Sequence, residues 1–116
     1  MEETKTQINH ESADSYFIRD EKHSYAQFFI NGSGDLVMNS DWGYFTHSWR
    51  SFGNDFKDFI AHMDVEYMIG KFEINVRMFY SKNGIPQRKH KEPHLIALIK
   101  IFQDILKIEL GQKPKP

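Results

Sequence analysis

The repeat of apolar residues along this 116-residue chain changes from two to 3.6 near residue 54. Before that point apolar and polar residues alternate, as they do along a strand with one buried face. After it the apolar residues recur three and four positions apart, which is the spacing of an amphipathic helix. A strand-rich first half followed by a helical second half predicts an α+β fold.

Four segments in the first half have the composition and alternation of strands. They are residues 16–18, 24–31, 35–40 and 44–50. In the second segment Tyr25, Gln27 and Phe29 fall on one side. Between the second and third segments, Gly32-Ser33-Gly34 tolerates positive φ, which predicts a tight hairpin. Spacings near ten residues indicate an antiparallel meander.

Helices are expected after residue 54. Asn54 is a suitable N-cap for the first, and Asp64 for a second that ends at Gly70. Pro93 suits the first turn of a last helix, and Gly111 is suited to end it. The last helix has a wide apolar stripe formed by Leu95, Leu98, Ile99, Phe102, Ile105 and Leu106.

Residues 71–80 are ambiguous, because their alternation favours a strand while a helix stays open. The expected architecture is a meander of about four strands, packed on one side by two or three helices, with an amphipathic C-terminal helix. We expect a disordered N-terminal segment (1–13), a single domain (14–111) and a mobile tail (112–116).

Composition limits the classes of function. Cysteine is absent and the formal net charge is −1, so nothing indicates a disulfide framework or a general attraction to nucleic acid. The acidic N-terminus is not a signal peptide, and no apolar run approaches the roughly 18 residues of a membrane span. Aromatic residues make up 15% of the chain, which leaves rings to spare for an interface. A soluble, cytoplasmic protein is expected.

No constellation of residues indicates catalysis. His90 and His94 are four apart, but Pro93 lies between them and predicts that a helix begins there, so a shared metal site is not expected. His47 is expected to be a half-buried structural residue, and turn chemistry explains Asp41. We therefore predict no enzyme activity, no metal and no cofactor.

Candidate partner-binding residues combine aromatic rings with a basic stretch. Trp42, Tyr44 and Trp49 are expected to be exposed anchors beside Arg50. The basic stretch, residues 81–91, contains no acid and carries Lys82, Arg88, Lys89 and Lys91. It is either a solvated loop or a contact for an acidic surface or phosphates. Rings that stack on bases keep nucleic acid open as a partner.

A family resemblance lies in the middle of the chain. The segment Asn39-Ser-Asp-Trp-Gly-Tyr-Phe-Thr-His-Ser-Trp49 is followed by Gly53, by Phe56 and Phe59-Ile60, and by Tyr67-Met68-Ile69-Gly70-Lys71-Phe72. With the lead-in Tyr25-Ala26-Gln27, it resembles a group of small, mostly uncharacterised proteins encoded by bacteriophages and prophages. Their pattern is roughly Ser-Asp-Tyr-Gly, spaced aromatics, Trp, Gly, Phe-x-x-Phe-Leu, Tyr and Gly-Lys. Here Trp42 replaces the usual Tyr, and the resemblance covers residues 24–72.

The resemblance implies a phage or prophage accessory protein in a bacterial cytoplasm. Small phage accessory proteins without catalytic sites commonly bind host machinery stoichiometrically. Our hypothesis is a non-catalytic inhibitor of a host defence complex such as CRISPR-Cas, with a host protein or ribonucleoprotein complex as its partner. The alternative is a nucleic-acid-binding accessory protein of phage replication or regulation. A homodimer is also open, because Ile96, Ile101 and Ile108 fall off the apolar stripe of the last helix.

Overall fold

The computed structural model describes residues 5–72 and 88–112, and for residues 88–91 the backbone alone. Within these residues, four strands are followed by three helices. The strands are β1 (Ala13–Asp20), β2 (Ser24–Asn31), β3 (Asp35–Ser40) and β4 (Gly43–Ser48). The helices are α1 (Phe56–Ala61), α2 (Val65–Phe72) and α3 (Arg88–Glu109). The α+β class and the four expected strands are confirmed.

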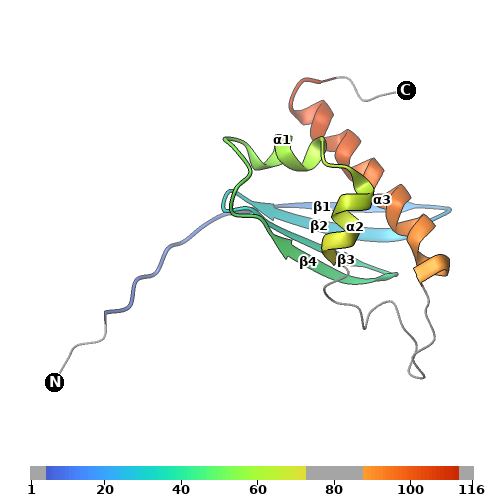
Figure 1. Ribbon diagram of the computed structural model, residues 1–116, viewed down its shortest axis with the longest axis horizontal. Helices are drawn as coiled ribbons and strands as arrows, with labels where there is room; N and C mark the ends of the chain where they lie inside the picture. The colour runs from blue at the N-terminus through green and yellow to red at the C-terminus, as the bar shows by residue number, and fades with distance from the viewer. Residues whose placement is uncertain (1–4, 73–87, 113–116) are drawn as a thin grey trace.

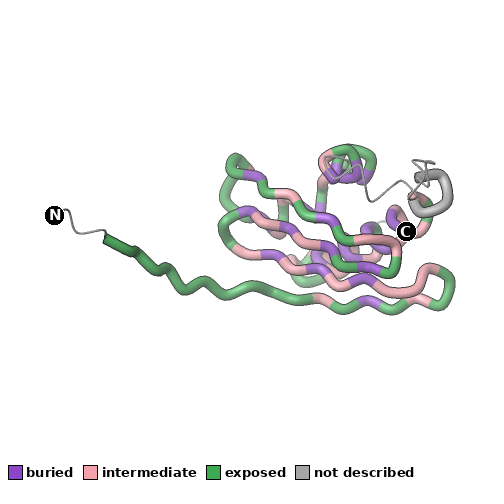
Figure 2. The backbone as a smooth tube through the Cα atoms, turned by 90° about the horizontal axis from the view of Figure 1, so that it is seen from below, coloured by how far each residue is buried: buried purple, intermediate pink, exposed green. Residues whose placement is uncertain are grey.

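The strands form one antiparallel sheet in the order β1-β2-β3-β4, so each strand pairs with its neighbour in sequence. The helices lie over the same face of this sheet (Figure 1). Along β2 and β3, buried residues alternate with residues that are more accessible, as Figure 2 shows from below. This is the pattern of a sheet with one packed face.

The packed face of the sheet holds the core. Phe28 of β2 lies opposite Tyr16 of β1 and Met38 of β3, and Met38 lies opposite Phe45 of β4. The ring of Phe102 on α3 stacks on Phe28, with centroids 4.1 Å apart and planes 7° from parallel. Burying one such ring contributes roughly 1.5–3 kcal/mol. The last helix is thereby joined to the centre of the sheet.

The β2–β3 hairpin turns at Gly32-Ser33-Gly34, as predicted. Gly34 has a φ of +98°, a region that L-residues avoid. Its carbonyl accepts a hydrogen bond from the backbone N–H of Trp49 at 2.8 Å. A β-carbon at Gly34 would lie 1.9 Å from the Trp49 carbonyl oxygen. The conformation and the close approach of the chain after β4 both require glycine here.

Acidic side chains begin the two short helices. The N-cap of α1 is Asp55, whose carboxylate accepts from the backbone N–H of Asp58 at 3.3 Å. The prediction of Asn54 was wrong by one residue, because the extended backbone that a cap needs is at Asp55. Asp64 caps α2 as predicted, by accepting from the N–H of Tyr67 at 3.1 Å.

The last helix begins at Arg88, so the prediction that it starts near Pro93 was wrong. Pro93 is the sixth residue of α3, and its missing N–H removes one hydrogen bond of the second turn. The helix ends as predicted, because Gly111 takes a φ of +75°. The N–H groups of Gly111 and Gln112 bond to the carbonyls of Ile108 and Lys107, which completes a Schellman motif.

The strand favoured for residues 71–80 lies mostly outside the described residues. Its first two positions, Lys71 and Phe72, belong to α2 instead. Phe72 is buried and contacts Phe45 of β4, with ring centroids 5.4 Å apart. This contact extends the helix beyond Gly70, where it was expected to end.

A buried amide holds α3 against α1. Gln103 is one of two buried polar side chains among the described residues. Its Nε2 donates to the carbonyls of Ile60 and Met63, at 3.0 and 2.7 Å. These carbonyls lie at or just beyond the C-terminal end of α1, where no further turn of α1 supplies N–H donors; the carbonyl of Ile60 also accepts from the N–H of Met63 at 3.2 Å. A side chain from α3 thus supplies hydrogen bonds to the carbonyl groups at the break between α1 and α2.

We expect Gly34→Ala to destabilise the protein by more than about 2 kcal/mol, because the left-handed backbone and the Trp49 carbonyl both oppose a β-carbon. Urea denaturation monitored by circular dichroism would measure this. Gly70→Ala is the matched control. Gly70 is exposed within α2, and a β-carbon there meets nothing within 4 Å. The control should stabilise by roughly 0.5–1 kcal/mol. Equal effects at the two sites would contradict this account.

Candidate functional site

The second face of the sheet has no described helix over it, and we call it the open face. Because side chains alternate, it is formed by the odd-numbered residues of β1, β2 and β3 and the even-numbered residues of β4. The register places them in rows across the sheet. The central rows are Phe17, Gln27, Asn39 and Tyr44, and then Ser15, Phe29, Val37 and Thr46.

Aromatic rings mark one part of the open face. Phe17 is 58% exposed and Tyr44 is 48% exposed. The ring of Phe17 stacks on that of Tyr25, with centroids 6.1 Å apart and planes at 15°. The guanidinium carbon of Arg19 lies 5.9 Å from the centre of the Phe17 ring. The open face therefore exposes apolar surface flanked by amide and hydroxyl groups.

Charge is sparse on this face. On the described strands, the charged side chains that belong to the open face are Arg19 and Asp35. Asp35 is already paired, because its Oδ1 lies 3.1 Å from Nη1 of Arg50. Arg50 also donates to the carbonyl of Ser33 at 2.7 Å. The face therefore offers rings and neutral hydrogen-bonding groups rather than an electrostatic field.

The carboxylate of Asp35 connects several polar side chains at the edge of the open face next to the β2–β3 turn. It accepts from the Ser48 hydroxyl at 2.6 Å and from the Asn31 amide at 2.8 Å. The Ser48 hydrogen bond is the main reason why the pKa of Asp35 falls below its ordinary value, followed by that of Asn31; the charge of Arg50 adds to them. The carboxylate stays ionised and joins β2, β3 and the chain after β4.

The sequence-predicted residues do not form a single site. Tyr44 is exposed on the open face. Trp49 is buried at 7% exposure, so the prediction that it is an exposed anchor was wrong. Its ring packs against Phe56 and Phe59, with centroids about 6 Å away. Trp42 is half-buried and stacks on His94, with centroids 4.0 Å apart, so its ring is already occupied within the fold.

The basic candidates lie elsewhere or outside the description. Arg50 is exposed but ion-paired with Asp35. Lys82 falls outside the described residues. Arg88, Lys89 and Lys91 belong to the first turns of α3, and their side chains are likewise outside the description.

Sequence reasoning missed four residues of the open face, namely Arg19, Phe17, Tyr25 and Phe29. The alternation of residues 24–31 did place Tyr25 and Phe29 on one side. Alternation did not reveal which face of the sheet the helices cover. An aromatic residue on the covered face is in the core, and one on the other face is at the surface.

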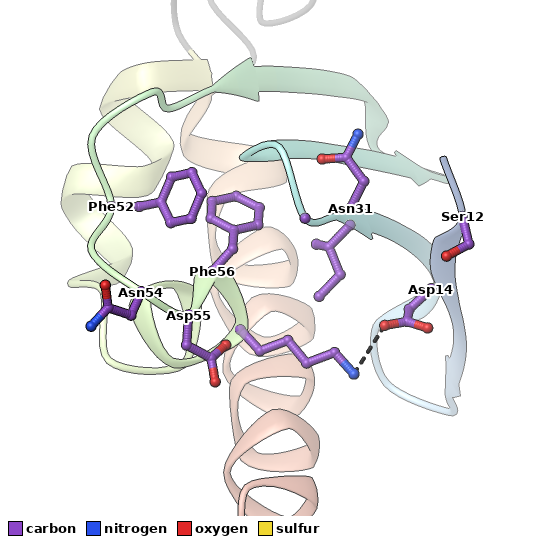
Figure 3. A pocket seen from close by; sticks show the side chains of 10 residues that line it. Ser12, Asp14, Asn31, Phe52, Asn54, Asp55 and Phe56 are labelled. Carbon is purple, nitrogen blue, oxygen red and sulfur yellow. Dashed lines mark ion pairs between the residues drawn. The ribbon is translucent and has the colours of Figure 1, made fainter. Parts of the chain in front are cut away.

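Beside the start of α1 lies a pocket of about 310 Å³ (Figure 3). Its polar lining includes Asp14 and Lys57, whose ion pair of 2.9 Å is dashed in the figure. Lys57 Nζ also lies 3.4 Å from Glu109 on α3. The hydrogen bond to Asp14 is the main cause that raises the pKa of Lys57 far above its usual range. Lys57 is therefore a permanent cation that joins β1, α1 and α3, unsuited to act as a nucleophile or a base.

Among the described residues, histidines and acids do not gather into a group of three or more metal ligands. Across residues 5–72 and 88–112, no group of three or more such side chains could hold a metal ion together. His47 packs edge-on against Trp49, with centroids 4.5 Å apart. Burial is the main cause that lowers its pKa, with the charge of Lys71 second, so it is neutral at pH 7.

The helix runs through Pro93, so His90 and His94 do share α3, contrary to the sequence argument.

Comparison with known proteins identifies the family. The profile of the phage family Phage_phiTE_072 matches residues 6–93, which is most of the chain and includes the whole sheet. The chain therefore belongs to this phage family. No curated protein and no solved structure matches it. Among the described helices, none has the length and apolar character needed to cross a bilayer.

We expect Asp35 to make stability depend on acid. Its folded pKa is lowered, so its contribution is complete above the ordinary pKa of 3.8 and is lost as pH falls below that value toward the folded pKa. Asp35→Asn should therefore destabilise the protein more at pH 7 than at about pH 3. Urea denaturation at both pH values would test this. An equal loss of unfolding free energy at pH 7 and at about pH 3 would show that the charge of Asp35 does not contribute to stability.

Proposed function

We propose that this phage protein is a non-catalytic inhibitor that binds a host defence complex, such as CRISPR-Cas, stoichiometrically in the bacterial cytoplasm. The open face of the sheet is the proposed contact surface. One observation carries the proposal: exposed rings lie among amides and hydroxyls on a face with little charge.

The composition of the open face supports protein binding. Phe17 and Tyr44 stand at opposite ends of one row, with Gln27 and Asn39 between them. Aromatic side chains supply large contact area while losing little conformational freedom, and they are enriched among residues that dominate binding energy. Amides and hydroxyls between them satisfy polar groups of a partner. This combination resembles the contact surface of an antibody more than that of an enzyme.

The scarcity of charge favours a protein over a nucleic acid. Affinity for DNA or RNA comes largely from cations that neutralise phosphates. On the described strands, Arg19 is the open-face cation, and it lies over Phe17. The chain as a whole has a net charge of −1. A nucleic-acid partner would instead stack its bases on Phe17 and Tyr25. The salt dependence of binding separates a nucleic-acid partner from a protein partner.

Size is compatible with stoichiometric binding. A standard interface buries about 800 Å² on each partner. The described chain has an accessible surface of 8215 Å², so such an interface would take about a tenth of it. The partner patch should itself be apolar and weakly charged, because a charged patch would lose its water here without gaining a counter-charge.

An infection assay tests this function. Expression of the protein in a host whose CRISPR-Cas system targets an infecting phage should restore plaque formation. Purified protein should co-elute with the purified defence complex at a fixed ratio. The double variant Phe17→Ser/Tyr44→Ala should lose both activities, with affinity reduced by more than about tenfold. Ile108→Ser is the matched control, since Ile108 is 61% exposed but lies on α3.

Two results would contradict the proposal. Full inhibition by the Phe17→Ser/Tyr44→Ala variant, with a normal melting temperature, would exclude the open face. Binding to DNA or RNA that weakens steeply with salt, without any effect on defence systems, would favour the alternative of a nucleic-acid-binding phage accessory protein.

A further inference from the structure

Three segments meet at one end of the sheet, around a pair of histidines. His23 lies in the β1–β2 turn, Trp42 in the β3–β4 turn and His94 on α3. The Nδ1 atoms of His23 and His94 are 3.1 Å apart. Two imidazoles from positions 71 residues apart in sequence thus direct the same ring nitrogen at each other.

The ring of His94 and the backbone of His23 are both held in place by their surroundings. His94 lies flat against the indole of Trp42, with planes 3° from parallel. The indole N–H of Trp42 donates to the backbone carbonyl of His23 at 2.7 Å. The backbone N–H of His23 donates in turn to Asp20 at 3.1 Å. The two nitrogens therefore meet within a framework that links both hairpin turns to α3.

The separation of the nitrogens fits a metal ion as well as a proton. Two imidazole ligands of tetrahedral zinc, with Zn–N bonds of 2.0–2.1 Å, stand roughly 3.3 Å apart. When each ring carries its proton on Nε2, both Nδ1 lone pairs converge. The Nε2 of His23 then faces the carboxylate of Asp20, whose Oδ2 lies 3.9 Å away. That distance is an electrostatic contact and not a hydrogen bond, and the same oxygen accepts from the backbone N–H groups of Lys22 and His23.

We propose that His23 and His94 form a binding site for a divalent transition-metal ion of the Zn²⁺ class. Imidazole ligands select such ions over Mg²⁺ or Ca²⁺, which prefer oxygen. Water fills the remaining positions, so the affinity is modest. A bound ion would join the β1–β2 turn directly to α3, and it would stabilise the folded chain in proportion to its concentration. This inference is independent of the proposed inhibition.

Calorimetric titration of the untagged, full-length protein with ZnCl₂ is the first test. We expect saturable binding of one ion per chain. His23→Ala and His94→Ala should each weaken binding by more than about tenfold, because each removes a ligand. His62→Ala is the matched control. Its Nδ1 lies 3.3 Å from a carboxylate oxygen of Asp58, so it is an exposed histidine beside an acid. The control should bind zinc as the unchanged protein does.

A second measurement needs no variant. In the unchanged protein, zinc should shift the Nδ1 resonances of His23 and His94 in nitrogen-15 spectra of the histidine rings, and should raise the melting temperature. Unaltered Nδ1 signals under saturating zinc would overturn the proposal and leave a simple N–H···N hydrogen bond. So would zinc binding of unchanged strength in the folded double variant His23→Ala/His94→Ala, or no saturable binding at all.

Discussion

The stack of Phe102 on Phe28 is the contact on which the rest of the fold depends. Phe28 lies on β2, an inner strand, and Phe102 lies near the middle of α3. Once α3 is fixed there, its other side chains reach the remaining layers. Gln103 holds the end of α1, and Glu109 bonds to Lys57 and to the hydroxyl of Tyr16, at 3.4 and 2.6 Å. One aromatic contact thus places a helix whose polar groups position α1 and the edge strand β1.

Periodicity predicted the four strands, their order in the chain and the fold class, because each strand alternates over a single packed face. It could not assign faces. Tyr44 and Trp49 are five residues apart, an odd separation, so a strand carrying both directs them to opposite sides. The strand in fact ends at Ser48, and the backbone bond from Trp49 to Gly34 turns the indole under α1. The start of α3 was missed because proline favours the first turn of a helix, whereas here Pro93 is the sixth residue of α3. The histidine pair joins positions far apart, which no local pattern reveals.

The aromatic residues divide between two tasks. Rings such as Phe28, Phe45, Phe102 and Trp49 fill the space between sheet and helices. Phe17 and Tyr44 remain on the open face, away from the ion pairs that connect β1, α1 and α3. Polar side chains thus stabilise the helical layer. Exposed apolar side chains occur on both layers, with Phe17 and Tyr44 on the sheet and Tyr67 and Ile108 on α2 and α3. The family match to phage proteins includes every strand of this sheet.

The nearest-neighbour order of the strands has a consequence for synthesis on the ribosome. Each strand finds its partner across a short turn, so the sheet is able to assemble early and with little loss of chain entropy. The part of its inner face around Phe28 stays uncovered until α3 leaves the exit tunnel, because Phe102 on α3 is the ring that stacks on it. A nascent chain stalled before residue 95 would leave Phe28 exposed, and chaperones or proteases would bind such a chain readily. Completion of the C-terminal helix is therefore the step that buries Phe28.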